Sequence, residues 1–306
     1  MTTEVRPSAG NGSAFQPGAD AAQQAGATLA EQTDAVILVG GQGTRLRPLT
    51  VNTPKPMLPT AGHPFLEHLL GRIRAAGMKH VVLGTSYRAE VFEEHFGDGS
   101  DLGLEIEYVF EAEPLGTGGG IRNVLDKLRY DTAMIFNGDV LGGTDLRAVL
   151  GTHAEKDADV TMHLVRVPDP RAFGCVPTDE DGRVLEFLEK TQDPPTDQIN
   201  AGIYVFRREI IESIPAGRPI SVEREIFPAL LDRGMNVYGH VDYAYWRDMG
   251  TPGDFVRGSS DLVRGIAPSP LLEGKHGEAL VDESASVGGG ALLYGCLLYT
   301  SLMARG

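Results

Sequence analysis

The sequence is poor in cysteine, in long apolar runs and in net positive charge. Its 306 residues include two cysteines, Cys175 and Cys296, which argues against a disulfide framework and favours a reducing, cytoplasmic setting. No apolar run approaches the roughly 18 residues of a membrane helix, and the first residues lack the charged-then-apolar order of a secretory signal. The formal net charge of −15 argues against a nucleic-acid partner, because such proteins usually show a basic face.

Composition changes sharply near residue 34. Residues 1–33 are rich in Ala, Gly, Gln and Ser without apolar periodicity, and we expect a disordered tail there. Short apolar runs then alternate with segments of helical spacing, which predicts an α/β fold with a mainly parallel sheet flanked by helices. The expected strands are 35–39, 80–84, 104–110, 133–136, 160–167, 184–188, 202–206 and 237–241. The expected helices are 64–76, 91–96, 121–128 and 222–231.

The last part of the chain has a different pattern. Residues 266–278 are rich in proline and glycine and predict a linker. Over 279–295 small and aliphatic residues recur every six positions, which is typical of a left-handed parallel β-helix. The repeat comprises Ala279, Ala285 and Ala291, and Val281, Val287 and Leu293. Three hexapeptides make one coil, so we expect the truncated onset of such a domain, with chance agreement as the alternative. Residues 296–306 break the repeat and resemble a translated sequencing adapter, which predicts an artefactual end.

Three glycines follow the first apolar run directly. Gly40, Gly41 and Gly43 can adopt positive φ and let a ligand approach the main chain. The pattern matches neither the dinucleotide-binding nor the P-loop fingerprint. Arg45 comes next, and Lys55 stands between two prolines. Because ligands of parallel sheets bind at the carboxyl ends of strands, these residues predict a site for a nucleoside triphosphate, and Asp139 after a later strand would face the same crevice.

The run G-G-x-G-T-R-L-x-P-L-T followed by P-K-P resembles the signature of the sugar-phosphate nucleotidyltransferases, which join a sugar 1-phosphate to a nucleoside triphosphate. Further segments match the family in its order between residues 34 and 265. These segments are 113–119, 137–139, 173–174, 187–190, 200–204 and 246–251. The resemblance implies a Rossmann-like, GT-A-like catalytic domain over 34–265.

The chemistry of this family brings two anions together. A sugar phosphate oxygen attacks the α-phosphorus and expels pyrophosphate, so positioning and charge neutralisation dominate the barrier. Asp139 is a natural hard-oxygen ligand for Mg²⁺, and the resemblance pairs it with Asp248, although each alone also suits a turn. Arg45 cannot deprotonate and suits the triphosphate, and Lys55 reaches phosphate as a point charge. No general base is needed, because the attacking phosphate is already ionised.

The resemblance also implies a site for the sugar phosphate. Glu189 accepts hydrogen bonds from sugar hydroxyls and Lys190 pairs with the sugar's phosphate, whereas taken alone such a pair is usually a solvated surface feature. Asn200 and the backbone of Gly174 complete this site. Thr191 stands where the family often has proline, which bears on the shape of that loop.

We expect the nucleotide substrate to be GTP. Guanine presents two adjacent donors, and one carboxylate accepts both; Glu111 or Glu113, before the Gly116 loop, would supply it. Segments 85–90, 199–204 and 221–228 resemble the guanylyltransferases that use mannose 1-phosphate. The full set of expected nucleotide-binding residues is Leu38, Gly40, Gly41, Gly43, Thr44, Arg45, Glu111, Glu113 and Gly116.

The resemblance therefore implies an enzyme that makes GDP-mannose and pyrophosphate from GTP and α-D-mannose 1-phosphate with Mg²⁺. It implies a homo-oligomer where the β-helix is complete. One alternative is the same chemistry with dTTP or UTP and glucose 1-phosphate. The other is a non-catalytic regulatory subunit that binds nucleotide sugar. The presence of Arg45, Lys55, Asp139, Lys190 and Asp248 disfavours the regulatory subunit.

Overall fold

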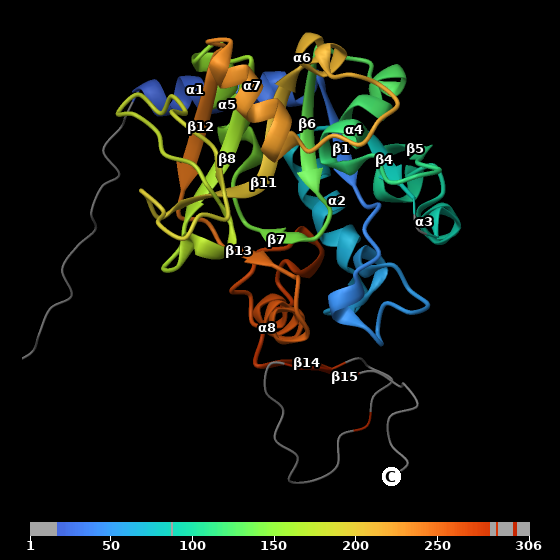
Figure 1. Cartoon of the computed structure of the whole chain (residues 1–306). Coiled ribbons are helices and arrows are strands. Elements are labelled where there is room, and N and C mark those ends of the chain that lie inside the picture. The colour runs from blue at the N-terminus through green and yellow to red at the C-terminus, as the bar shows by residue number, and fades with distance from the viewer. Residues whose placement is uncertain (1–16, 87, 282–285, 287–295, 299–306) are drawn as a thin grey trace, which may run out of the picture.

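A computed structural model describes residues 17–86, 88–281, 286 and 296–298. A nine-stranded sheet forms its centre (Figure 1). Four parallel strands make up one half of it, in the order β6 (Thr132–Asn137), β1 (Thr33–Leu38), β4 (His80–Thr85) and β5 (Glu105–Phe110). The prediction of a mixed, mainly parallel α/β sheet is confirmed.

The other half of the sheet is mostly antiparallel. β11 (Gln198–Arg207) pairs with β6 and with β8 (Val160–Arg166), and β12 (Val237–Asp242) runs parallel to β8. The short strands β9 (Gly174–Cys175) and β10 (Leu188–Glu189) close one edge. The expected strand over 184–188 is mostly loop, because residue 184 makes only an isolated bridge to Thr178.

Helices cover both faces of the sheet because alternate strand residues are apolar on each side. Ala35 and Ile37 join a core with the first group of helices, and Val36 joins the core on the other face. The first group comprises α1 (Pro17–Ala30), α2 (Phe65–Ala76), α3 (Ala89–Phe96) and α5 (Leu146–Glu155). The second comprises α4 (Gly116–Asn123), α6 (Arg208–Ser213) and α7 (Phe227–Asp232).

Two expected helices differ in extent. The helix placed over 121–128 begins earlier, as α4 from Gly116, and ends at Asn123 before a separate 3₁₀ turn, Leu125–Lys127. The segment 222–231 divides into a π-helical turn, Val222–Ile226, and α7. Both changes occur beside the glycine-rich start of α4, where Gly118 N–H donates to the Ile220 carbonyl. Tertiary contacts therefore override the apolar spacing here.

The expectation of a disordered tail is wrong for residues 17–30. They form α1, which packs on α5 (Figure 1). Two glycines allow the close contact: a Cβ on Gly26 would lie 1.9 Å from the Arg147 carbonyl oxygen, and one on Gly151 would lie 2.4 Å from that of Ala22. The sequence shows few large apolar residues there because the contact uses small ones. Residues 1–16 of the expected tail lie outside the described residues.

The expectation of a plain linker over 266–278 is also wrong. Ala267 and Leu272 are buried in a third apolar core, which includes β7 (Val140–Gly142) and α8 (Pro252–Val263). The Ser269 hydroxyl hydrogen-bonds His68 Nδ1 at 2.7 Å. The segment therefore packs against α2, β7 and α8.

β14 (Ala279–Val281) pairs in parallel with β15 (Cys296–Leu298). Most of the hexapeptide segment and residues 299–306 lie outside the described residues. The β-helix and the artefactual end therefore stay predictions.

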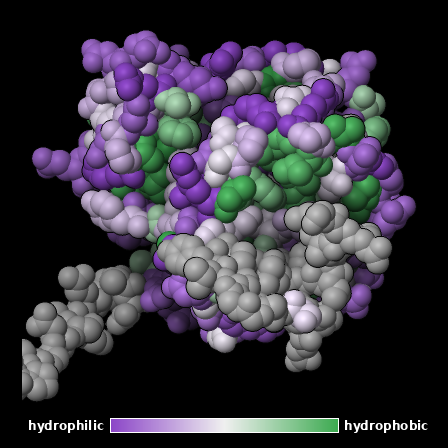
Figure 2. Space-filling view, turned by 90° about the horizontal axis from the view of Figure 1, so that it is seen from below, coloured by the Kyte–Doolittle hydropathy of each residue, from purple (hydrophilic) through white to green (hydrophobic). Residues whose placement is uncertain are grey.

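Seen from the end that carries α8 (Figure 2), hydrophilic residues surround smaller apolar areas. Within the described part of the chain, no helix has the length and apolar character to cross a membrane.

We predict that Gly151→Ala destabilises the protein. The new methyl would overlap the Ala22 carbonyl, and such overpacking costs about 1–3 kcal/mol of unfolding free energy. Gly253 lies in α8 with only the Thr251 hydroxyl near its missing Cβ, so Gly253→Ala is the matched control, with a gain of up to about 1 kcal/mol. Urea unfolding measures both. Equal stability changes for the two variants would contradict the close α1–α5 contact.

Candidate functional site

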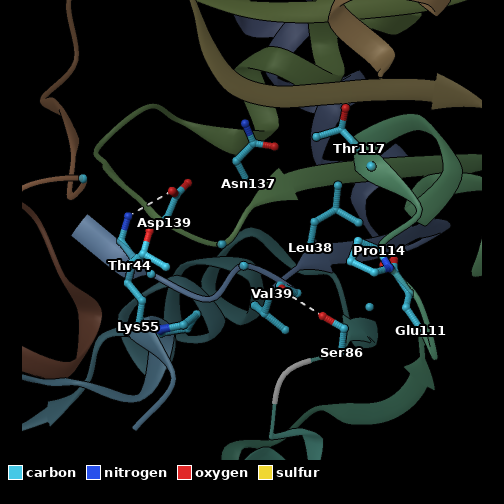
Figure 3. A pocket seen from close by; sticks show the side chains of 18 of the residues that line it. Leu38, Val39, Thr44, Lys55, Ser86, Glu111, Pro114, Thr117, Asn137 and Asp139 are labelled. Carbon is cyan, nitrogen blue, oxygen red and sulfur yellow. Dashed lines mark hydrogen bonds and ion pairs between the residues drawn. The ribbon is translucent and has the colours of Figure 1, made fainter. Parts of the chain in front are cut away.

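A cavity of about 540 Å³ opens where β1, β4 and β6 end (Figure 3). Most residues expected to bind nucleotide line it, together with several that were not expected. Its lining residues are Leu38, Val39, Gly40, Gly41, Gly43, Thr44, Arg45, Leu46, Lys55, Pro56, Gly84, Ser86, Glu111, Pro114, Gly116, Thr117, Asn137, Gly138, Asp139 and Gly250. Glu113 is exposed and is not among them.

The glycine loop keeps its main chain open to this cavity. Gly43 has φ +58°, and a Cβ there would lie 3.0 Å from Thr50 Cγ2, so the loop needs glycine. The Thr50 hydroxyl donates to the Gly43 carbonyl at 2.8 Å, and the Ser86 hydroxyl donates to the Gly40 carbonyl at 2.7 Å. The loop leads into a 3₁₀ turn, Thr44–Leu46, which is too short to supply much helix dipole. Contacts to a phosphate group would therefore come from the backbone N–H groups of the loop and from charged side chains.

Asp139 and Asp248 meet through strand pairing. β13 (Trp246–Asp248) lies antiparallel to β7, with Asp248 opposite Val140. The Met249 N–H then donates to the Asp139 carbonyl at 3.1 Å. Asp139 lines one end of the cavity, and Asp248 lies next to that end without lining the cavity itself.

Lys55 lies between these carboxylates. Its Nζ is 2.9 Å from Asp139 Oδ2 and 3.9 Å from Asp248 Oδ1, and its side chain is only 8% exposed. Burial raises the pKa of Asp248, and the charge of Asp139 raises it further, while Lys55 and Arg45 oppose the shift. The two carboxylates thus repel one another and attract cations.

Arg45 approaches the same end of the cavity from the glycine loop. A Cβ on Gly250 would lie 2.9 Å from Arg45 Nη1 and 2.8 Å from Asp248 Oδ2. Gly250 therefore makes room for the guanidinium beside the carboxylate. The positive groups Arg45 and Lys55 are both in position to meet a phosphate chain.

Glu111 lies at the opposite end of the cavity from Asp139 (Figure 3). Burial raises its pKa. The Leu115 N–H reaches Oε2 at 3.4 Å, while Oε1 lies 2.7 Å from where a Cβ on Gly120 would stand. The structure thus separates the two candidates for base recognition, because Glu111 lines the cavity and Glu113 does not.

The residues expected to bind the sugar phosphate gather at the β9–β10 edge of the sheet, and none of them lines the cavity. Glu189 pairs with Gly174 across β10 and β9, and a Cβ on Gly174 would lie 3.2 Å from Glu189 Oε2. Lys190 has φ +53°, and its Nζ is 3.5 Å from Glu189 Oε1. Asn200 is on the neighbouring strand β11. The four residues are near one another in the sheet, and their binding roles stay predictions.

Trp246 links this group to the carboxylates. Its Nε1 donates to the Ala201 carbonyl at 3.0 Å, and its ring meets Phe173 edge-on at 5.2 Å. Asp248 is two residues further along β13. The same strand therefore contacts β11, on the side of the expected sugar site, and carries one of the two carboxylates.

Sequence reasoning gave no role to several residues around the cavity. Ser86, Thr117 and Asn137 line it directly. Glu223 accepts hydrogen bonds from the Thr117 hydroxyl at 2.7 Å and the Ser221 hydroxyl at 2.8 Å. All four residues lie in segments that resemble the family, and that resemblance was the available signal; the segments are 85–90, 113–119, 137–139 and 221–228.

No cluster of three or more His, Cys, Asp or Glu residues suited to a metal occurs among residues 17–86, 88–281, 286 and 296–298. Asp139 and Asp248 nevertheless fit Mg²⁺, which usually takes one or two carboxylates and completes its shell with phosphate oxygens and water. The sharing of one ammonium by both carboxylates shows that they converge on a single cation.

Comparison with known proteins agrees with this geometry. The nucleotidyl transferase family model matches residues 34–265, and the chain belongs to that family. Among its relatives is a mannose-1-phosphate guanylyltransferase of Mycobacterium tuberculosis, which is 70% identical over 265 residues, 86% of this chain and 74% of that protein. A mannose-1-phosphate guanylyltransferase catalytic subunit beta of Drosophila pseudoobscura pseudoobscura is 37% identical over 86% of this chain and 72% of that protein.

Solved structures are similar too. HddC from Yersinia pseudotuberculosis, in complex with GMP-PN, is 30% identical with a TM-score of 0.66, over 75% of this chain and 99% of that one. A putative glucose-1-phosphate thymidylyltransferase from Bacillus anthracis has a TM-score of 0.69 over 74% of this chain and 94% of that one. Its 22% identity supports the fold alone.

We predict that Asp248→Asn stabilises the ligand-free protein. The raised pKa means that the folded state holds the Asp248 proton more tightly than the unfolded state, whose value is near 3.8. The contribution of Asp248 to the free energy of unfolding is therefore present below its unfolded-state pKa. It is lost as pH rises through its folded-state pKa. At about pH 7 asparagine removes that penalty, so Tm rises by a few degrees.

Thermal unfolding of both proteins across pH measures this effect. The difference in Tm should vanish well below pH 3.8, where the wild-type carboxyl is protonated in both states. A lower Tm for Asp248→Asn at neutral pH would contradict the repulsion between the carboxylates.

Proposed function

We propose that this chain is an enzyme that transfers a guanylyl group from GTP to α-D-mannose 1-phosphate and releases GDP-mannose and pyrophosphate. The observation that carries the proposal is the 70% identity to a mannose-1-phosphate guanylyltransferase. The cavity supports it, with cationic groups and two carboxylates at one end and Glu111 at the other.

The reaction needs no proton transfer. An ionised oxygen of the sugar phosphate forms a bond to the α-phosphorus, and the bond to the β-phosphate oxygen breaks, so the electron pair leaves with pyrophosphate. Arg45 and Lys55 neutralise the triphosphate as charge shifts. The glycine loop from Gly40 to Gly43 donates backbone N–H groups to the phosphates.

Asp139 and Asp248 hold the metal in this proposal, which we take to be Mg²⁺. When bound, the ion supplies positive charge to the phosphates and helps to align them. Lys55 then transfers its hydrogen bond from Asp139 to a phosphate oxygen. Glu189 and Asn200 orient the sugar hydroxyls, and Lys190 pairs with the sugar phosphate beside Gly174. A cytoplasmic location and a homo-oligomer built through a complete β-helix belong to the same proposal.

Glu111 selects guanine by accepting both donors of its Watson–Crick edge. Thymine and uracil present a single donor on that edge, so a buried carboxylate there leaves one oxygen unpaired. The pKa of Glu111, raised by burial, fits a carboxylate that awaits donors from a ligand.

We predict that wild-type protein prefers GTP with mannose 1-phosphate. Pyrophosphate release would be measured with GTP, dTTP, UTP and ATP against mannose and glucose 1-phosphates. We expect kcat/KM at least about tenfold above every other pair. Glu111→Gln should lower kcat/KM for GTP by roughly 10- to 100-fold, because one guanine donor then faces an amide donor.

Glu113→Gln is the matched control, since Glu113 is exposed outside the cavity, and its kinetics should equal wild type. Faster turnover of dTTP or UTP with glucose 1-phosphate would refute the guanylyl assignment. Tight binding of GDP-mannose without turnover of any pair would instead identify a regulatory subunit.

A further inference from the structure

Tyr204 is a buried phenol on β11 to which the proposed reaction gives no role. Its side chain is fully buried, and its ring packs 5.1 Å from the ring of Phe227 in the apolar core. Its hydroxyl points out of that core toward the amide of Asn200. One end of Tyr204 is therefore fixed by packing and the other by polar contacts.

Asn200 is held at both ends of its amide. Its Nδ2 donates to the Tyr204 hydroxyl oxygen at 2.6 Å, and its Oδ1 accepts from the Gly202 N–H at 3.0 Å. These contacts are possible because the register of β11 against β8 shifts between Asn200 and Tyr204, and Gly202 has φ +80°. The irregular strand fixes one orientation of Asn200 and leaves its second N–H for another partner.

Asn137 approaches the same segment of β11 from the nucleotide side. It ends β6 and lines the nucleotide cavity. A Cβ on Gly202 would lie 3.0 Å from Asn137 Nδ2, so only glycine permits this approach. Gly202 thus brings an amide of the nucleotide cavity against the part of β11 that carries Asn200 and Tyr204.

Tyr204 is not suited to proton transfer. Burial raises its pKa far above the usual value, and the negative charge of Glu223 adds to the rise, so the phenol stays neutral. Its contribution is geometric, through the Asn200 amide that it holds.

We propose that Tyr204 is a positioning residue that aligns the sugar phosphate with the α-phosphorus by fixing the Asn200 amide. The proposal rests on the proposed function of the site. The sugar reaches Asn200 only in the orientation that Tyr204 and Gly202 impose. Loss of the hydroxyl frees the Asn200 amide to rotate, while the ring still fills the core.

Tyr204→Phe tests this with the loss of one oxygen atom. We expect KM for mannose 1-phosphate to rise about tenfold and kcat to fall several-fold, because a misplaced reactant loses effective concentration. The Kd of GTP, measured by calorimetry without sugar phosphate, should stay within about twofold of wild type, since its cavity contacts remain.

Tyr108→Phe is the matched control. The Tyr108 hydroxyl donates to the Gly97 carbonyl at 2.8 Å, away from the cavity, and its loss should change no kinetic constant. Asn200→Ala provides a second test. Adding Tyr204→Phe to it should change kcat and KM little further, because both substitutions remove the same positioned amide. Additive losses in the double variant would overturn the proposal.

Unchanged kcat and KM in Tyr204→Phe would also overturn it, as would equal weakening of GTP and mannose 1-phosphate, which signals general loosening. Failure of the proposed function would appear in the wild-type protein, as absent turnover of this substrate pair. Calorimetry would then compare the Kd of mannose 1-phosphate and of glucose 1-phosphate between wild type and Tyr204→Phe. Equal Kd values for the two proteins would contradict the role of Tyr204.

Discussion

The pairing of β13 with β7 brings two carboxylates from distant parts of the chain to a single lysine, Lys55. Asp139 follows the central strand β6, whereas Asp248 arrives after the whole second half of the domain. Their mutual repulsion is offset by Lys55, which is buried at 2.9 Å from Asp139. The remaining parts of the site are arranged around this charge cluster, which in the proposed function neutralises the phosphates.

The same strand pair supports the sugar side. Trp246 fixes β13 to the Ala201 carbonyl of β11, and the Tyr204 hydroxyl on that strand accepts a hydrogen bond from Asn200. The two substrate regions are therefore connected through rigid strands. Such preorganisation suits a reaction whose barrier depends on placing two anions in line.

Much of this arrangement was predictable from the sequence. The parallel strands were visible because buried strands read as continuous apolar runs, and the glycine loop and Asp139 follow strand ends directly. The choice between Glu111 and Glu113 was not predictable, since it depends on how the chain turns after β5. The α1–α5 contact was missed because Gly26 and Gly151 act through the absence of side chains. Tyr204 looked like an ordinary core aromatic, and only the irregular register of β11 reveals its hydroxyl contacts.

The most direct test of the account is pyrophosphate release by Asp139→Asn with Mg²⁺, GTP and mannose 1-phosphate, alongside a thermal unfolding curve. Asparagine keeps the shape of the side chain but removes the charge that faces Lys55 and that would hold the proposed metal. We expect turnover to fall by roughly 10²- to 10³-fold while the cooperative unfolding transition is retained. Near wild-type turnover would contradict the central role of the two carboxylates.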